Sequence, residues 1–210
     1  MINHLGLVWD FIKDYLELII HREVKMKIRI TILTFILAAA LLLLCSCSSK
    51  QDLKPPIRTV VAEELLNRGM AQIEDHEFDR AIDNFNRVLK INPQNVTAYY
   101  HRGVAYDRKG YYDKAIADYT KAIQINPRAT IAYYHRGLDW VQKGNYDNAI
   151  ADFTKTIEID PVHVLAYHNR GTAWYYKGDY DRTCSDLQKS CELGNCTGLD
   201  WARKKGICKK

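Results

Sequence analysis

Four cysteines near the C-terminus are the residues best suited to chemistry in this 210-residue chain. Cys184, Cys191, Cys196 and Cys208 could hold a zinc ion or form two disulfides. Structural zinc sites commonly contain a Cys-x-x-Cys pair, and the sequence has none. Because an even number of thiols in an exported protein favours disulfides, we predict two disulfide bonds and no metal site.

The spacing of these cysteines limits which disulfide pairs are possible. Cys184 and Cys191 fall on one expected helix, two turns apart, and should therefore not pair with each other. If residues 198–208 form a helix that runs back along the preceding one, Cys184 approaches Cys208, while Cys191 and Cys196 bracket the turn. We therefore expect the pairs Cys184–Cys208 and Cys191–Cys196, which would fasten a C-terminal helix to the domain.

Cys47 stands in the setting of a lipid-modified residue. It follows an uncharged apolar run, residues 30–44, which is preceded by basic residues as in a secretory signal. The run ends in Leu44-Cys45-Ser46-Cys47, which resembles the lipobox of bacterial lipoproteins: a leucine three places before the modified cysteine and a small residue just before it. Cys47 meets both requirements, whereas Leu44 occupies the small-residue place before Cys45.

This resemblance implies that residues 26–46 are a signal peptide and that Cys47 carries acyl chains that hold the mature chain at a membrane. Ser48, rather than aspartate, follows the cysteine, which implies the outer membrane. We therefore expect a lipid-anchored protein of the bacterial cell envelope that faces the periplasm. An uncleaved membrane-spanning helix is the alternative, because the apolar run is close to spanning length.

The segments on either side of this signal carry fewer cues. Met26-Lys27-Ile28-Arg29 would begin a normal signal peptide, so we interpret residues 1–25 as an upstream extension or a mis-called start. A genuine amphipathic helix is the alternative, because apolar residues recur there at helical spacing. Residues 47–61 are polar and contain Pro55-Pro56, which predicts a lipidated tether.

A glycine then returns every 34 residues, at positions 69, 103, 137 and 171. It divides the chain into four units, which are 62–95, 96–129, 130–163 and 164–197. Each unit has two helical patterns; the second begins at an aromatic-Asp pair, and Asn-Pro or Asp-Pro closes the first three units. One unit of this size cannot cover its own apolar face, so the copies must stack.

These units resemble the tetratricopeptide repeat, whose pattern places aromatic residues fourth, eleventh and twenty-fourth, Gly eighth, Ala twentieth and Pro thirty-second. In chain order, the second unit has Tyr99, Gly103, Tyr106, Ala115, Tyr119 and Pro127, and the third has Tyr133, Gly137, Trp140, Ala149, Phe153 and Pro161. The resemblance implies an all-α, right-handed α-solenoid of four helix hairpins. Trp201 continues the fourth-place series at the same step, so we expect residues 198–210 to form a capping helix and a basic tail.

Several polar residues share the 34-residue period and are expected to serve the scaffold. Arginines 68, 102, 136 and 170 are followed sixteen residues later by Asn84, Asp118, Asp152 and Asp186, which predicts a structural ion pair between the two helices of each unit. The small eighth and twentieth residues would let those helices approach closely, while the aromatic residues fill the space between units. His101 and His135 are interpreted as scaffold positions and not as metal ligands.

The resemblance places binding on the concave face, where this family generally holds extended peptides or partner helices. In each first helix the second, fifth, ninth, twelfth and thirteenth places line that face. The predicted groove residues are Tyr100, Val104, Asp107, Arg108, Ile131, Tyr134, Leu138, Val141, Gln142, Leu165, His168, Tyr175 and Tyr176. Packing between neighbouring units is the alternative role for the tyrosines. The Lys and Asn that clamp a terminal carboxylate in chaperone-binding members are missing.

No catalytic set emerges from the sequence. Ser185 and Ser190 lack a base and an oxyanion loop, and no glycine loop could cradle phosphate. The net charge of +5 is too small to indicate a nucleic-acid partner. We therefore expect a non-catalytic scaffold without cofactor or small-molecule substrate, which binds protein partners in the groove. The alternative is a structural accessory subunit that uses its convex face or its cap.

Overall fold

The computed structural model describes residues 57–209, and this part of the chain forms helices and no strand. The helices are α2 (Ile57–Glu74), α3 (Phe78–Ile91), α4 (Val96–Arg108), α5 (Tyr112–Ile125), α6 (Thr130–Gln142), α7 (Tyr146–Ile159), α8 (Val164–Tyr176), α9 (Tyr180–Glu192) and α10 (Thr197–Lys204). The expected signal peptide, Cys47 and most of the tether lie outside the described residues. The tether prediction was wrong at its end, because residues 57–61 belong to α2.

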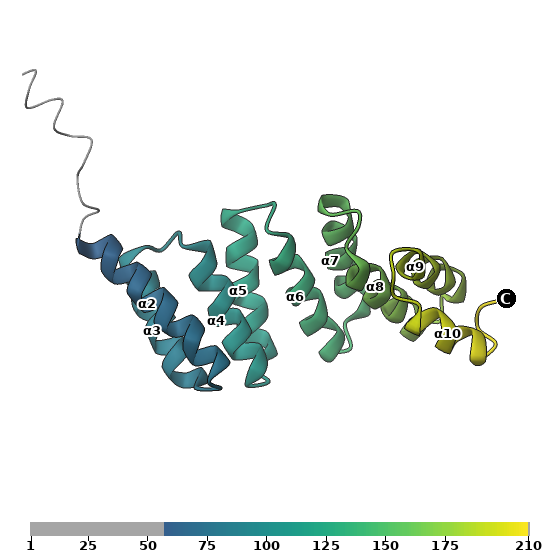
Figure 1. Ribbon diagram of the computed structural model, residues 1–210, viewed down its shortest axis with the longest axis horizontal. Helices are drawn as coiled ribbons and strands as arrows, with labels where there is room; N and C mark the ends of the chain where they lie inside the picture. The colour runs from purple at the N-terminus through teal and green to yellow at the C-terminus, as the bar shows by residue number, and fades with distance from the viewer. Residues whose placement is uncertain (1–56, 210) are drawn as a thin grey trace, which may run out of the picture. The chain divides into compact units, whose positions relative to one another are not determined.

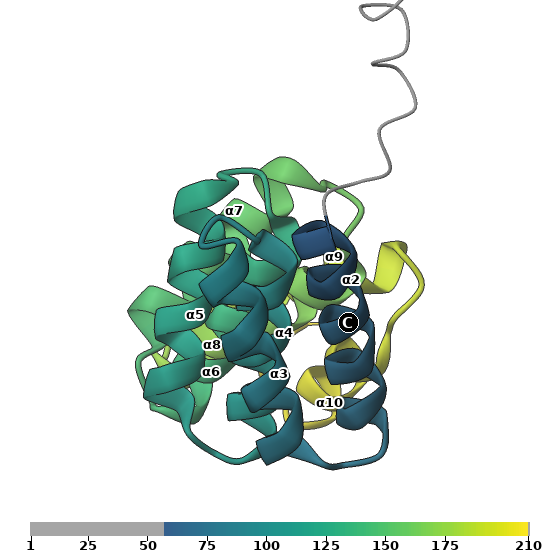
Figure 2. The same ribbon diagram turned by 90° about the vertical axis from the view of Figure 1, so that its left-hand side faces the viewer.

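The helices follow one another in a row of hairpins, from α2 and α3 at one end to α9 and α10 at the other (Figure 1). Figure 2 looks along this row, so that successive hairpins overlap. Each first helix packs on its own second helix, and α4, α6 and α8 also pack on the second helix of the preceding unit. The all-α solenoid predicted from the repeats is confirmed. Among the described helices, none is both long enough and apolar enough to cross a membrane.

The two helices of a unit lie on different sides of the row. The first helices contact one another in sequence, α2 with α4, α4 with α6 and α6 with α8, whereas within residues 57–209 no comparable contacts join successive second helices. The first helices therefore line the tighter, inner side of the row. We call this side the inner face, and the side formed by α3, α5, α7 and α9 the outer face.

The helix boundaries follow the expected signals. The four second helices begin at Phe78, Tyr112, Tyr146 and Tyr180, as the aromatic-Asp pairs predicted. The turn before three of them places Gly110, Gly144 and Gly178 in the left-handed region, with φ between 70° and 81°. In the first unit His76 takes this place with φ 61°. Side chains of this kind adopt that conformation at a cost, so the first unit has a less favourable turn.

In the first three units the repeated glycine sits directly over a buried ring of its own unit, whereas Gly171 of the fourth unit faces Leu187. A Cβ on Gly103 would lie 2.7 Å from Cε1 of Tyr119, and a Cβ on Gly137 would lie 2.7 Å from Cε1 of Phe153. The glycines therefore allow the two helices of a unit to approach closely, as predicted. The same contact shows that the twenty-fourth-place rings pack inside a unit, so the prediction that all the aromatic residues fill the space between units was wrong.

The fourth-place tyrosines do join neighbouring units. Tyr99 of α4 packs against Leu65, Val88 and Leu89 of the first unit. It also contacts a second cluster, together with Tyr133 of α6, that contains Ala122 and Ile123 of α5. These tyrosines therefore cover the apolar face that a single unit leaves open.

Three arginines bridge three helices each. In the second unit Arg102 donates from Nε and Nη2 to the Asp118 carboxylate at 2.7 and 2.6 Å, and from Nη1 to Asn86 of the preceding unit at 2.6 Å. Arg136 and Arg170 repeat the pattern with Asp152 and Asp186, and donate Nη1 to Thr120 and Thr154. The predicted ion pair is confirmed in these units, with an additional bond to the unit before.

The first unit departs from this pattern. Arg68 pairs with Glu64 on its own helix at 2.6 Å, and Asn84 instead donates to Gln72 at 2.7 Å. The prediction of an Arg68–Asn84 pair was therefore wrong. Asn84 carries no charge that would hold a guanidinium, and no described unit precedes this one to offer the third hydrogen bond.

The C-terminal helix α10 covers the last unit, but the side of α10 that faces the unit is not the side that the repeat pattern predicts. Its buried residues are Gly198, Leu199 and Ala202, which pack against Leu187 of α9, whereas Trp201 is 42% exposed. Trp201 therefore does not occupy the place of the fourth-place tyrosines, and that prediction was wrong. The helix also ends at Lys204, four residues before the expected end.

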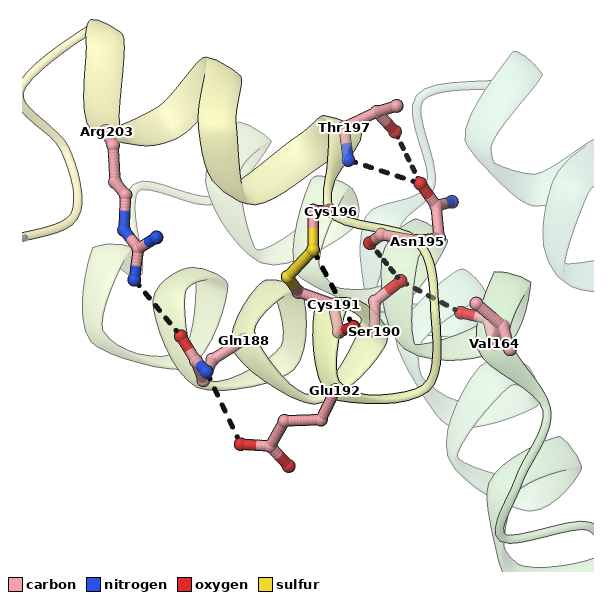
Figure 3. The surroundings of a disulfide bond; sticks show 9 residues. All are labelled: Val164, Gln188, Ser190, Cys191, Glu192, Asn195, Cys196, Thr197 and Arg203. Carbon is pink, nitrogen blue, oxygen red and sulfur yellow. Dashed lines mark hydrogen bonds between the residues drawn. A yellow bond between two sulfur atoms is a disulfide. The ribbon is translucent and has the colours of Figure 1, made fainter.

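The cap is joined to α9 by two disulfides. Cys184 bonds to Cys208, with Cα atoms 5.5 Å apart, and Cys191 bonds to Cys196 across the turn, with Cα atoms 3.9 Å apart. Hydrogen bonds fix the same turn: Asn195 Oδ1 accepts from the backbone nitrogen and hydroxyl of Thr197 at 3.3 and 2.6 Å (Figure 3). The start of α10 is therefore held in place covalently and by polar contacts.

The contact between glycine and ring gives a direct test of the repeat register. Gly103→Ala should lower the free energy of unfolding by about 1–3 kcal/mol, because the Tyr119 ring is fully buried and has no room to move. Gly171→Ala is the matched control: its Cβ would lie 3.2 Å from Leu187 Cγ, so we expect a smaller loss. Chemical denaturation of both variants measures the difference. Equal stabilities would contradict the assigned register.

Candidate functional site

The two faces of the solenoid differ in chemistry. On the outer face the exposed side chains of α3, α5 and α7 are charged, amide or alanine, and α9 adds one exposed aromatic side chain, Tyr180, at 51%. Those of α3, α5 and α7 are Asp79, Arg80, Asp83, Arg87, Lys90, Asp113, Lys114, Ala117, Lys121, Gln124, Asp147, Asn148, Ala151, Lys155 and Glu158. The first helices instead expose large apolar groups on the inner face. Ile131 is 52% exposed, Leu165 49% and Tyr176 58%. Exposed apolar side chains in a row are typical of a surface that contacts another molecule.

Tyrosines and histidines form a continuous layer beneath this surface. The ring of Tyr100 lies 4.9 Å from His101 and 5.5 Å from His135 of the next unit, and the ring of Tyr134 lies 4.8 Å from His163. Asn169 donates to the Tyr134 hydroxyl at 2.9 Å. These two tyrosines therefore join neighbouring units. Within residues 57–209 no group of His, Cys, Asp or Glu is placed to hold a metal ion.

Three half-buried histidines on this side, His101, His135 and His168, are uncharged members of the packing. Burial lowers the pKa of His101, of His135 and of His168. Burial also raises the pKa of Tyr100 and Tyr134. At neutral pH the rings are therefore neutral, and they offer a partner aromatic surface with polar tips.

The other predicted groove residues differ in accessibility. Val104, Asp107, Leu138 and Val141 are half-buried on the inner face, while Arg108 and Gln142 are exposed at the ends of α4 and α6. The inner face therefore offers apolar contact area along its length, with charged groups near the end of α4. The role of these residues in binding stays a prediction.

A pocket of about 330 Å³ lies at the C-terminal end of the inner face. Its walls come from α8, α9 and α10; the lining residues are His168, Thr172, Tyr175, Tyr176, Thr183, Leu187, Thr197, Gly198 and Trp201. The rings of Tyr175 and Trp201 meet edge to face at 5.1 Å. No lining residue is an acid, lysine or arginine, so the pocket suits an uncharged group.

This pocket follows from the register of α10. The short helix α10 covers Leu187 with Leu199 and Ala202. It leaves open the space beside Tyr175 and Tyr176 of α8, and this space is the pocket. Gly198 is needed there, since a Cβ would lie 2.8 Å from the His168 ring. The groove residues predicted from the sequence include His168, Tyr175 and Tyr176 on the α8 side of the pocket, whereas the α10 side was missed because Trp201 was placed in the fourth-place series.

A buried acid on the inner face was not anticipated from the sequence. Asp139 of α6 is 1% exposed, at a place where the other units have Ala71, Ala105 and Ala173. It faces the preceding unit, where burial and then the charge of Asp139 raise the pKa of the Tyr119 phenol. Tyr119 is itself unusual, because its place holds Phe85 and Phe153 elsewhere. These two breaks in the repeat were the available signal.

Asp139 shares its environment with Asp107 of α4. Burial, and then the Asp107 carboxylate, raise the pKa of Asp139 to about 8. When both groups are ionised, Oδ2 of Asp139 has no hydrogen-bond partner in the described part of the chain, and neither has the Tyr119 hydroxyl. With one proton between them, Asp139 and Asp107 can share a hydrogen bond. The pair therefore holds one proton at neutral pH.

This pair predicts a pH-dependent stability. The folded chain keeps Asp139 protonated to about pH 8, whereas an aspartate in an unfolded chain ionises near pH 4. The folded state therefore binds more protons between these values, and its stability falls as the pH rises through that window. Asp139→Ala removes this loss, so its advantage over the native chain should grow by about 1.4 kcal/mol for each pH unit across the window, to about 5 kcal/mol in all, and then stay constant.

Denaturation of the native chain and of Asp139→Ala across this pH range measures the effect. Asp83→Ala is the charge-matched control, because it removes an exposed carboxylate from the outer face of α3. An advantage of Asp139→Ala over Asp83→Ala that does not change with pH would refute the shared proton.

Comparison with known proteins agrees with this architecture. A family model described as Tetratricopeptide repeat matches residues 96–128 and 130–163, and one described as TPR repeat matches residues 74–110. A crystal structure of MamA is 30% identical, with a TM-score of 0.62 over 63% of this chain and 77% of that one. No curated protein gives a significant match.

Two further structures show the same fold. MamA 41-end from Desulfovibrio magneticus RS-1 is 24% identical, with a TM-score of 0.60 over 63% of this chain and 75% of that one. Pseudomonas aeruginosa PilF is 16% identical, with a TM-score of 0.60 over 66% of this chain and 64% of that one.

The chain belongs to the tetratricopeptide repeat family. Members of this family are protein-interaction scaffolds and are generally non-catalytic. The likeness to MamA, which covers most of that protein, extends from the stacked hairpins to their sequence. The inner face is therefore the first place to consider for a protein partner.

Proposed function

We propose that this protein is a lipid-anchored scaffold of the bacterial cell envelope that binds a peptide or helix of a partner protein on its inner face. The proposal joins the fold to the features of the N-terminal sequence. The repeats supply a surface for a partner, and an acylated Cys47 would keep that surface at the periplasmic side of a membrane.

The observation that carries the binding proposal is the contrast between the two faces. Ile131, Leu165 and Tyr176 expose about half of their surface on the inner face. Among the exposed residues of α3, α5, α7 and α9 on the outer face, Tyr180 of α9 is the single aromatic or branched aliphatic side chain. Covering apolar groups releases water at a gain of about 25 cal/mol per Å². An extended peptide or a helix lying along the inner face would obtain this gain, and the outer face offers little of it.

Photocrosslinking in intact cells tests which face is used. We expect a benzophenone side chain at Ile131 or Leu165 to give adducts with a partner, because both residues are exposed on the inner face. The matched controls are Lys121 of α5 and Lys155 of α7, which are exposed on the outer face. Adducts from the controls alone would contradict the proposal and favour a structural accessory subunit that uses its outer face.

The membrane anchor has its own test. Cys47→Ser should take up no labelled fatty acid and should keep its signal peptide, because the thiol that would carry the diacylglycerol is removed and cleavage follows that modification. Cys45→Ser is the matched control and should be labelled and cleaved like the native chain, since Leu44 stands in the small-residue place before Cys45. The intact mass of the native mature chain should show acylation and cleavage before Cys47. A Cys47→Ser chain that takes up labelled fatty acid as the native chain does would contradict the lipid anchor.

A further inference from the structure

The buried aspartates of the solenoid differ in how their charge is balanced. Four aspartates are buried in the described residues, and three of them, Asp118, Asp152 and Asp186, each receive two hydrogen bonds from an arginine. Asp139 is the fourth, and in residues 57–209 neither it nor Asp107 pairs with a lysine, arginine or histidine. Burying a carboxylate without a cation costs free energy. This pair therefore differs from the other three buried aspartates, each of which is paired with an arginine.

We infer that Asp107 and Asp139 form a recognition site for a basic side chain, an arginine or lysine of the partner that lies on the inner face. The inference rests on the proposed function, because it names the chemistry of that partner. In the free chain one proton on the pair neutralises one of the two carboxylates, because no cation in the described residues pairs with it. In the complex the partner supplies the cation, as the arginines do for the other three aspartates.

The position of the pair fits this role. Asp107 is half-buried on the inner face, so a cation reaches it first, and Asp139 lies behind it. Tyr100 lies on α4 with Asp107, its ring is 5.5 Å from that of His135 on α6, and it provides an aromatic neighbour for a guanidinium. The buried Tyr119 hydroxyl has no partner in the described residues and can donate to a newly ionised carboxylate.

The charged and titratable groups around the pair set its pH dependence. They are Tyr100 and Arg108 on α4, Asp118 and Tyr119 on α5 and His135 on α6. Asp118 is already paired with Arg102, and His135 is held neutral by burial. Arg108 is exposed at the end of α4 and does not pair with either carboxylate. A partner cation beside Asp107 favours the ionised form of Asp139, so its proton leaves to solvent as the complex forms.

The test begins with random peptides displayed on phage and selected against the immobilised full chain. The same library is selected against Asp139→Ala, which has the alanine found at this place in the other units and should therefore fold. We expect arginine or lysine to be enriched only in the peptides selected by the native chain. Asp83→Ala, which removes an exposed outer-face carboxylate, should select the same basic peptides as the native chain.

A selected peptide and its variant with alanine for the basic residue then complete a double-mutant cycle. The native chain should bind the basic peptide about tenfold more tightly than the alanine peptide, and Asp139→Ala should reduce this ratio to about threefold or less. Calorimetry near neutral pH in two buffers of different ionisation enthalpy should show proton release for the native chain and none for Asp139→Ala.

The outcomes separate the two proposals. If neither the native chain nor Asp139→Ala selects peptides, binding on the inner face is refuted, and the recognition site with it. If peptides bind but show no basic enrichment, or if the cycle shows no coupling to Asp139, the recognition site is refuted while binding on the inner face stands. Coupling together with proton release supports the site.

Discussion

The fold depends on one constraint: a single helix hairpin cannot cover its own apolar face, so each unit must stack on the next in a fixed phase. Two contacts set that phase. Gly103 lets the Tyr119 ring lie directly against α4, which fixes the distance between the helices of a unit. Arg102 then bonds to Asp118 of its own unit and Asn86 of the preceding one, which fixes the rotation between units. Each contact occurs in three units, and the second and third units have both, so the same places fall in line along the inner face.

A constant phase also makes the exceptions informative. Where a place is filled as in the other units, its side chain serves the stack. Asp139 and Tyr119 break the pattern at one point and bring two buried polar groups together without a cation. The cap breaks it again at the last unit, where α10 leaves a pocket between Tyr175 and Trp201. Both exceptions lie on the side of the first helices, next to exposed apolar residues, where a partner on the inner face would contact them.

Periodicity explains what could be predicted from the sequence. The starts of α3, α5, α7 and α9 and the arginine–aspartate pairs repeat at one step, so each copy supports the others. The failures occur where a residue has no copy to follow. Arg68 lacks an acidic partner, α2 begins five residues early, and Trp201 keeps the spacing of the series while Leu199 and Ala202 decide which side of α10 is buried. Asp139 was missed because the pattern treats its place as a small core residue.

The central claim is that the inner face, and not the outer one, receives the partner. Hydrogen exchange of the full chain with and without a partner that crosslinking has identified tests it most directly, because each helix is followed separately. The account predicts slower exchange in α4, α6 and α8 on binding, with α3, α5 and α7 changing little. Protection confined to α3, α5 and α7 would contradict it.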